Sequence, residues 1–171
     1  MFTEASLENV ICNLFETAGY EHKLGEELHK GLSDVLLVED TEVYLKGHYP
    51  DITPSEIQRV LNTLKAQKMT SLYEENARIY RMITEGFSIK RDDPMAPPLW
   101  IRMIDFPTSE NPDAVNTNIF KIVNQVEIVE KTKRRPDAII YINGLPLVVM
   151  EFKSAIKDNC TIMDAYTQIT V

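Results

Sequence analysis

The sequence has little cysteine, no long apolar run and no export signal. Cys12 and Cys160 are the only cysteines in 171 residues. They lie far apart, so they form no metal-ligand pair, and we expect reduced thiols. No apolar stretch approaches the roughly 20 residues of a membrane-spanning helix. The N-terminus, MFTEASLENV, has no basic residue and is not a signal peptide. We predict a cytoplasmic protein that does not bind a membrane.

Basic charge is also scarce. The 18 lysines and arginines are outnumbered by 26 acidic residues, which gives a net charge of −8. A free-standing DNA-binding protein usually carries a basic excess, so any DNA affinity would come from a local basic patch or from partners. No Gly-x-x-x-x-Gly-Lys-Ser/Thr loop occurs, which argues against a P-loop for ATP in this chain.

The remaining composition is typical of a globular domain, with 44% hydrophobic and 26% charged residues. A length of 171 residues favours one domain. Apolar periodicity and capping residues predict helices over 4–18, 54–67, 71–85 and from about 160 to the end. Strands are predicted over 33–46 (a strand or hairpin), 87–90, 100–106, 118–129, 137–142 and 147–153. This order predicts an α/β fold with a mixed, largely antiparallel sheet flanked by helices.

The stretch RRPDAIIYINGLPLVVMEFKS carries the chemistry. Asn143-Gly144 between two apolar strands is a strong hairpin signal, and the hairpin would bring Asp137 close to Glu151 and Lys153. Two carboxylates at a sheet edge suit Mg²⁺, and a lysine beside them can stabilise charge on a phosphate. A lone Glu-x-Lys usually only solubilises a strand end, but the added Pro-Asp at hairpin distance favours a nuclease.

The register of this hairpin decides whether the carboxylates can share a metal. A strict two-residue turn pairs Asp137 with Met150, so that Asp137 faces away from Glu151. A shift of one residue, through a three-residue loop or a bulge near Pro146, puts both carboxylates on one face. We therefore predict one of these two irregularities.

Four segments of the sequence match one known family: TEASLENVICNLFETAGY, IDFPTSENPDAVNTNIFKIVNQ, RRPDAIIYINGLPLVVMEFKSA and DAYTQI. The third is the most specific, with Pro-Asp, Asn-Gly-x-Pro and Glu-x-Lys in order. Over nearly its whole length the chain resembles the N-terminal nuclease region of type I restriction enzyme R subunits. The resemblance implies the PD-(D/E)xK restriction-endonuclease-like fold. It also implies a subunit that cuts double-stranded DNA with Mg²⁺ after ATP-driven translocation.

The resemblance also implies roles for individual residues. Asp137 and Glu151 would ligate the metal, the backbone carbonyl of Phe152 would help to hold it, and Lys153 would be catalytic. Gln168 matches the glutamine of the family's Gln-x-x-x-Tyr motif and would orient the site. The tyrosine of that motif would stand one position beyond the last residue of this chain.

The first helix offers a further acidic candidate. Glu8 resembles the first-helix glutamate that approaches the metal in many such nucleases; Glu4 is its rival, and a plain solvated or first-turn role is the third reading. Glu8 borders the apolar stripe predicted to face the core, and Glu4 lies nearer its centre. The stripe comprises Leu7, Val10, Ile11, Leu14, Phe15 and Ala18.

A basic run precedes the hairpin, formed by Lys131, Lys133, Arg134 and Arg135. It either contacts DNA phosphates without reading sequence or offsets acidic neighbours such as Glu127.

Taken together, these patterns predict a Mg²⁺-dependent DNA endonuclease domain over residues 1–171, the N-terminal part of a longer subunit. An ATP-binding motor downstream of this domain, a methyltransferase subunit and a specificity subunit would be its partners. One alternative is a non-catalytic docking module of the restriction complex, and another is a different PD-(D/E)xK nuclease. Metal binding distinguishes the docking module from the nuclease, because a docking module has no need of two converging carboxylates.

Overall fold

The computed structural model describes residues 3–66, 71–129, 132–153, 162 and 166–167, with no side chains at 114–116. The chain divides into two compact units, Met1–Leu37 with Ile119–Val171 and Val38–Asn118. None of the helices in the described part is long and apolar enough to cross a membrane. Most of the helix predicted from residue 160 onward, with Gln168, lies outside the described residues.

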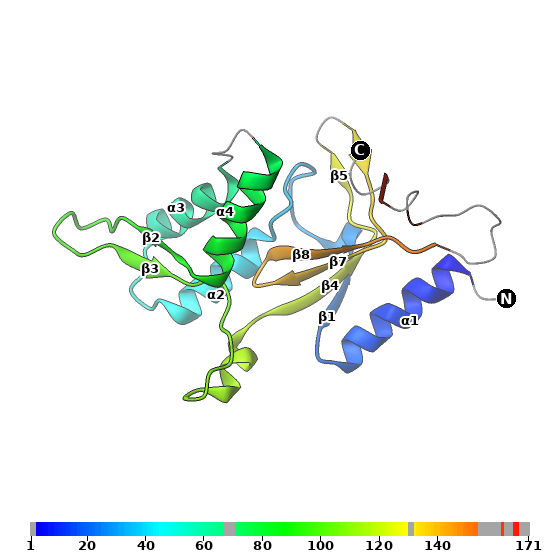
Figure 1. The fold of residues 1–171 in the computed structure, drawn as a ribbon, viewed down its shortest axis with the longest axis horizontal. Coiled ribbons are helices and arrows are strands. Elements are labelled where there is room, and N and C mark those ends of the chain that lie inside the picture. The colour runs from blue at the N-terminus through cyan, green and yellow to red at the C-terminus, as the bar shows by residue number, and fades with distance from the viewer. Residues whose placement is uncertain (1–2, 67–70, 130–131, 154–161, 163–165, 168–171) are drawn as a thin grey trace. The chain divides into compact units, whose positions relative to one another are not determined.

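The first unit is built on a four-stranded mixed sheet (Figure 1). Its strands, in spatial order, are β1 (Glu21–Leu24), β4 (Phe120–Asn124), β7 (Ala138–Ile142) and β8 (Leu145–Met150). β1 pairs in parallel with β4, whereas β4–β7 and β7–β8 are antiparallel. The predicted α/β fold with a mixed, largely antiparallel sheet is therefore confirmed. A short 3₁₀ turn, η1 (Gly25–Glu27), follows β1.

Helix α1 (Glu4–Thr17) packs against β1 and β4, as predicted for this segment. The apolar stripe predicted to face the core was partly wrong. Cys12 is the buried residue of α1 and packs with Ile122 and Ala138, while Val10 and Leu14 are exposed. Glu8, one turn before Cys12, accepts hydrogen bonds from Asn124 and Gln125 at the end of β4, so this side of α1 lies against the sheet.

The strand or hairpin predicted over 33–46 is wrong, because α2 (Val38–His48) forms there. Its buried residues are Thr41, Tyr44 and Leu45, a spacing of three and four that places them on one helical face. The apolar run before the helix suggested a strand. Its two leucines are instead buried in the irregular segment that leads into α2.

The single strand predicted over 118–129 is also wrong, because it is divided at Gln125. Gln125 has a left-handed backbone (φ +57°), and its N–H donates to the carbonyl oxygen of Asp137 at 3.0 Å. β4 ends just before this residue, and β5 (Ile128–Val129) then pairs with β6 (Lys133–Arg134) in a separate small ladder. The turn at Gln125 thus brings the end of β4 next to the start of β7.

The second unit contains the two helices predicted from capping signals. α3 (Pro54–Lys65) has Pro54 in its first turn and Thr53 as its cap, and α4 (Leu72–Thr84) is capped by Ser71. Two predicted strands form a small antiparallel ladder, β2 (Phe87–Ile89) and β3 (Leu99–Ile101). β3 is shorter than the predicted 100–106, and a 3₁₀ segment, η2, spans Pro112–Thr117.

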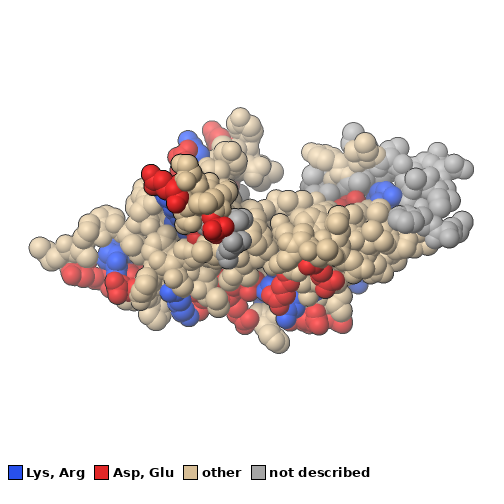
Figure 2. Space-filling view, turned by 90° about the horizontal axis from the view of Figure 1, so that it is seen from below, with Lys and Arg blue, Asp and Glu red and all other residues tan. Residues whose placement is uncertain are grey.

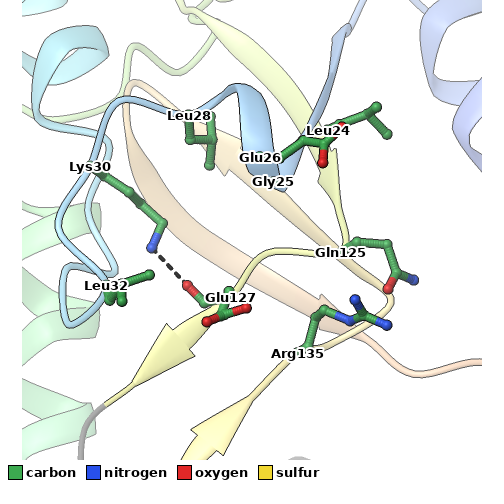
Figure 3. A pocket seen from close by; sticks show the side chains of 9 residues that line it. All are labelled: Leu24, Gly25, Glu26, Leu28, Lys30, Leu32, Gln125, Glu127 and Arg135. Carbon is green, nitrogen blue, oxygen red and sulfur yellow. Dashed lines mark hydrogen bonds between the residues drawn. The ribbon is translucent and has the colours of Figure 1, made fainter.

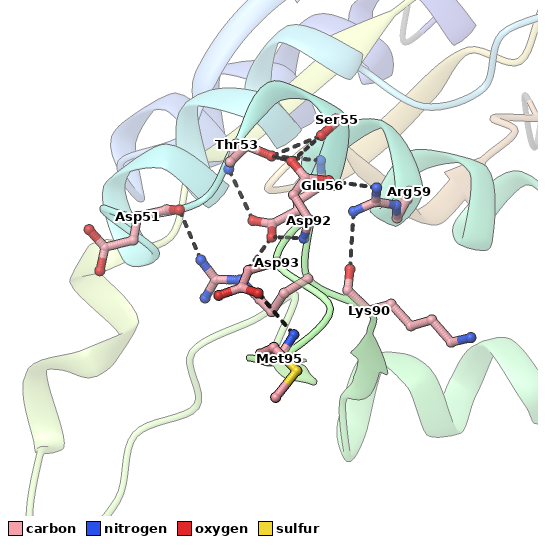
Figure 4. A network of polar contacts seen from close by, with 10 residues as sticks. Asp51, Thr53, Ser55, Glu56, Arg59, Lys90, Asp92, Asp93 and Met95 are labelled. Carbon is pink, nitrogen blue, oxygen red and sulfur yellow. Dashed lines mark hydrogen bonds and ion pairs between the residues drawn. The ribbon is translucent and has the colours of Figure 1, made fainter. Parts of the chain in front are cut away.

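A buried carboxylate joins α3 to the loop after β2 (Figure 4). Glu56 is 1% exposed; one of its oxygens accepts from Arg91 Nε at 2.8 Å and from the N–H of Asp92 at 2.9 Å. The other accepts from the N–H of Thr53 at 3.1 Å. Burial acts to raise the pKa of Glu56, but these donors outweigh it and hold the pKa below its ordinary value.

We expect Glu56→Gln to lower the free energy of unfolding by about 2 kcal/mol, because an amide turns one acceptor into a donor that faces an N–H. Because the folded pKa is depressed, the stabilisation by Glu56 is present above its ordinary pKa and lost as the pH falls. Urea denaturation at pH 7 measures the change. Glu42→Gln, which loses only the exposed pair with Lys46, should cost under about 0.5 kcal/mol. Equal costs for the two variants would contradict the role given to Glu56.

Candidate functional site

The turn of the β7–β8 hairpin is the predicted Asn143-Gly144. Both residues have left-handed backbones, with φ +51° and +82°, and Ile142 pairs with Leu145 across them. Such a turn matches the twist of the two strands. Asn143 is fully buried: its Oδ1 accepts from the N–H of Ile119 at 2.7 Å, and its own N–H donates to the Ile119 carbonyl at 2.9 Å. These bonds tie the turn to the start of β4.

A bulge then shifts the register, which confirms the prediction of an irregularity and selects the bulge over a longer loop. Tyr141 pairs with Pro146, whereas Ile140 pairs with Val148, so Leu147 is the extra residue. After the bulge every pair is offset by one residue relative to the turn. The hairpin therefore keeps its two-residue turn, while beyond the bulge each residue of β7 pairs with a residue of β8 one position further along.

The bulge brings the predicted site residues together. Ala138 pairs with Met150, so the next position places Asp137 opposite Glu151. The N–H of Phe152 donates to Asp137 Oδ2 at 2.6 Å, and Lys153 Nζ donates to Glu151 Oε1 at 2.9 Å. The Glu151 side chain is 10% exposed. Two acids and a lysine thus meet at the end of the sheet where β8 stops.

The electrostatics of this cluster are those of crowded acids. Burial raises the pKa of Asp137; the Phe152 N–H opposes this rise, and the charges of Glu151 and Glu8 add to it. The hydrogen bond to Glu151 raises the pKa of Lys153. The site therefore holds an excess of negative charge, and Lys153 is a charged ammonium at neutral pH.

Glu8 reaches the same cluster from α1. Its carboxylate accepts from Asn124 Nδ2 at 2.7 Å and from Gln125 Nε2 at 3.0 and 3.1 Å. The charge of Glu8 contributes to the raised pKa of Asp137, whereas the charge of Glu4 contributes to the raised pKa of Lys153. Of the two candidates, Glu8 is the one that side chains at the end of β4 hold in place.

The amides that hold Glu8 were not predicted from the sequence. Asn124 also has its Oδ1 3.0 Å from Nε2 of His22 on β1, and His22 Nδ1 lies 3.6 Å from Glu16. The signal available was position: Asn124 and Gln125 follow directly after an apolar strand. Polar residues at a strand end can face a site beyond the edge of the sheet.

One residue of the basic run has the second predicted role, and contact with DNA phosphates stays a prediction. Lys133 pairs with Glu127 at 2.6 Å, as expected if the run offsets acidic neighbours. Arg135 is exposed and stands two residues before Asp137, while Lys131 lies outside the described residues. On the face shown in Figure 2, acidic and basic side chains of the described part are interspersed.

Among the described residues, no three or more of His, Cys, Asp and Glu lie close enough together to hold a metal ion. Asp137 and Glu151 are opposite each other in the hairpin register, and the charges of Glu151 and Glu8 both act on Asp137. Gln168, the remaining predicted site residue, lies outside the described part of the chain.

The protein is of the α/β class, with a mixed sheet and a cluster of two acids and a lysine at one end of it. Comparison with known proteins identifies the family. The family described as type I restriction enzyme R protein N terminus matches residues 1–171. The chain belongs to this family.

Two relatives illustrate the family. The chain is 27% identical over 98% of its length to the type I restriction enzyme HindI endonuclease subunit of Haemophilus influenzae. It is 30% identical over 98% of its length to the type I restriction enzyme SauCOLORF180P endonuclease subunit of Staphylococcus aureus. The chain spans 16% of the length of each of these relatives.

Proposed function

We propose that this chain is a Mg²⁺-dependent DNA nuclease domain with PD-(D/E)xK chemistry. The observation that carries the proposal is the bulged hairpin register, which puts Asp137 opposite Glu151 with Lys153 bound to Glu151. A bulge that aligns two acids at a strand end is the kind of irregularity found beside active sites. The relatives' printed description as endonuclease subunits supports the same activity.

The donor chemistry fits Mg²⁺. This ion prefers hard oxygen ligands and is usually bound by one or two carboxylates, with water and substrate phosphate completing its shell. Burial raises the pKa of Asp137, and the charges of Glu151 and Glu8 raise it further; a bound cation would oppose both effects, because it stabilises the charged carboxylate. Asp137 and Glu151 would hold the ion, with the carbonyl of Phe152. A bound Mg²⁺ would stabilise charge on the phosphate oxygens during hydrolysis.

Lys153 supplies positive charge next to these acids. Its hydrogen bond to Glu151 raises its pKa, so it faces the substrate as an ammonium and not as a base. We propose that it stabilises the charge that develops on the cleaved phosphate. Glu8, held by Asn124 and Gln125, would orient the polar groups around Asp137.

The proposed substrate is double-stranded DNA in the cytoplasm. Because this chain spans a small part of its relatives, we propose that an ATP-driven motor elsewhere in the subunit delivers the DNA. Methyltransferase and specificity subunits would complete the assembly, and Gln168 would orient the site.

A docking module is the second candidate, favoured by one observation. Leu147, Val148 and Val149 of β8 are 37–45% exposed, on a strand that pairs only with β7 in this sheet. An apolar edge of this kind can receive a partner. This role does not require acids that converge, so metal binding distinguishes the two functions.

Calorimetric titration of the chain with Mg²⁺ or Mn²⁺ tests the proposal. We expect a single binding event whose affinity falls at least tenfold in Asp137→Ala, because that variant removes one of two carboxylate ligands. Glu110 is an exposed acid of the second unit, and Glu110→Ala should bind the ion with the same affinity as the unchanged chain. Equal binding by all three proteins, or no binding by any, would contradict a metal site at Asp137 and favour the docking role.

A further inference from the structure

A cavity of about 520 Å³ opens at the same end of the sheet as the proposed nuclease centre (Figure 3). Leu24 is the last residue of β1, Gln125 follows β4, and Arg135 stands shortly before β7; all three line the cavity. Gln125 belongs to both places, because its side chain holds Glu8 and its N–H donates to the backbone carbonyl oxygen of Asp137. Whatever occupies the cavity therefore lies next to the acids.

The wall of the cavity combines three leucines with charged and polar side chains. Leu24, Leu28 and Leu32 line it, and Leu24 and Leu32 are 40% and 57% exposed. Leucines left in contact with water at a concave site favour a ligand with an apolar surface. The volume is within the usual range for small-molecule pockets, roughly 300–1,000 Å³.

Two charged side chains of the cavity wall, Lys30 and Glu127, are already engaged within the protein. Lys30 Nζ already donates to the carbonyl oxygens of Asp34 and Glu127 at 2.9 and 3.0 Å, and the Glu127 carboxylate pairs with Lys133. This ammonium therefore holds the loop in place. The Gln125 amide nitrogen is bound to Glu8, so its carbonyl oxygen and the Arg135 guanidinium are the hydrogen-bonding groups that the wall offers to a planar ligand.

We propose that this cavity receives one unstacked nucleobase of the DNA strand, adjacent to the phosphodiester held at Asp137 and Glu151. The inference rests on the proposed nuclease function and adds a subsite to it. The leucines would contact the faces of the base, and Gln125 and Arg135 would bind its polar edge. Seating the base would fix the strand relative to the acids.

NMR of the chain with ¹³C-labelled leucine methyl groups tests this subsite. The probe is a single-stranded oligonucleotide with Ca²⁺ in place of Mg²⁺, compared with an abasic strand of the same length and charge. We expect the methyl signals of Leu24, Leu28 and Leu32 to shift with the normal strand and not with the abasic strand. The methyl groups of Leu72, which is 83% exposed in the second unit, serve as the internal control.

A matched pair of variants makes the test quantitative. Leu32→Asn should weaken binding of the normal strand about tenfold, because it removes apolar contact without adding charge, and leave binding of the abasic strand unchanged. Leu72→Asn should change neither. Equal shifts with both strands, or binding without shifts at the three leucines, would overturn the subsite and leave the nuclease standing. Absence of binding by both strands would also overturn the subsite, whereas the calorimetric titration with Mg²⁺ decides the nuclease proposal separately.

Discussion

Glu151→Gln in the full-length endonuclease subunit should reduce DNA cleavage by at least about 10³-fold. Glutamine keeps the shape of the side chain and an oxygen for Lys153, but it removes the charge that would hold Mg²⁺. Charge stabilisation by a metal contributes several kcal/mol to the transition state, and each 1.36 kcal/mol is tenfold in rate. The rate of cleavage of a DNA carrying the recognition site is the measurement.

The same variant should not lose stability. The Glu151 carboxylate contributes to the raised pKa of Asp137, so a neutral side chain removes repulsion in the metal-free protein. Because the bond from Lys153 loses its charged acceptor at the same time, we expect a melting temperature close to that of the unchanged chain, and unchanged ATP hydrolysis in the full subunit. Glu110→Gln serves as the control. Cleavage at the normal rate by Glu151→Gln would refute the assigned site.

Lys153→Met should reduce cleavage by about 10²–10³-fold, the usual cost of removing one group that stabilises transition-state charge. Its effect on metal binding should be the opposite of that of Asp137→Ala. Lys153 Nζ now occupies Glu151 Oε1 at 2.9 Å, so its removal frees that oxygen and removes a positive charge. We expect Mg²⁺ affinity to stay the same or to increase.

Comparing calorimetry with cleavage rates separates the two roles. Loss of metal binding in Lys153→Met would mean that the lysine acts through the structure of the site and not on the phosphate. The free energy of unfolding without Mg²⁺ should fall, because Glu151 loses its partner, and added Mg²⁺ should restore it. A variant that unfolds equally easily with and without the ion would contradict this account.

The sequence contained enough information for the local elements whose signals are chemical. Pro54 and Ser71 mark the beginnings of α3 and α4. Proline has a fixed φ and no N–H that needs a partner, and the Ser71 side chain accepts from a free N–H group at the helix start. Asn143-Gly144 marks the hairpin, because both positions need left-handed backbones. The alternation of side chains along a strand also predicted an irregularity between the turn and the acids.

Elements without such signals were predicted wrongly. The segment over 33–46 mixes apolar and polar residues in a way that fits strand and helix, and burial of Thr41, Tyr44 and Leu45 decides for the helix. The division of the segment 118–129 depends on a bond from Gln125 to Asp137, which is distant in sequence. Periodicity alone contains no record of such a contact.

By itself the sequence determined the helix caps, the hairpin turn and the chemical identity of Asp137, Glu151 and Lys153, because these depend on residue type and short spacing. Only the tertiary structure decided which irregularity corrects the register and that Glu8 is held by Asn124 and Gln125. It also decided that a cavity opens beside them. Those features arise where strand ends from separate parts of the chain meet, and packing between distant residues sets their geometry.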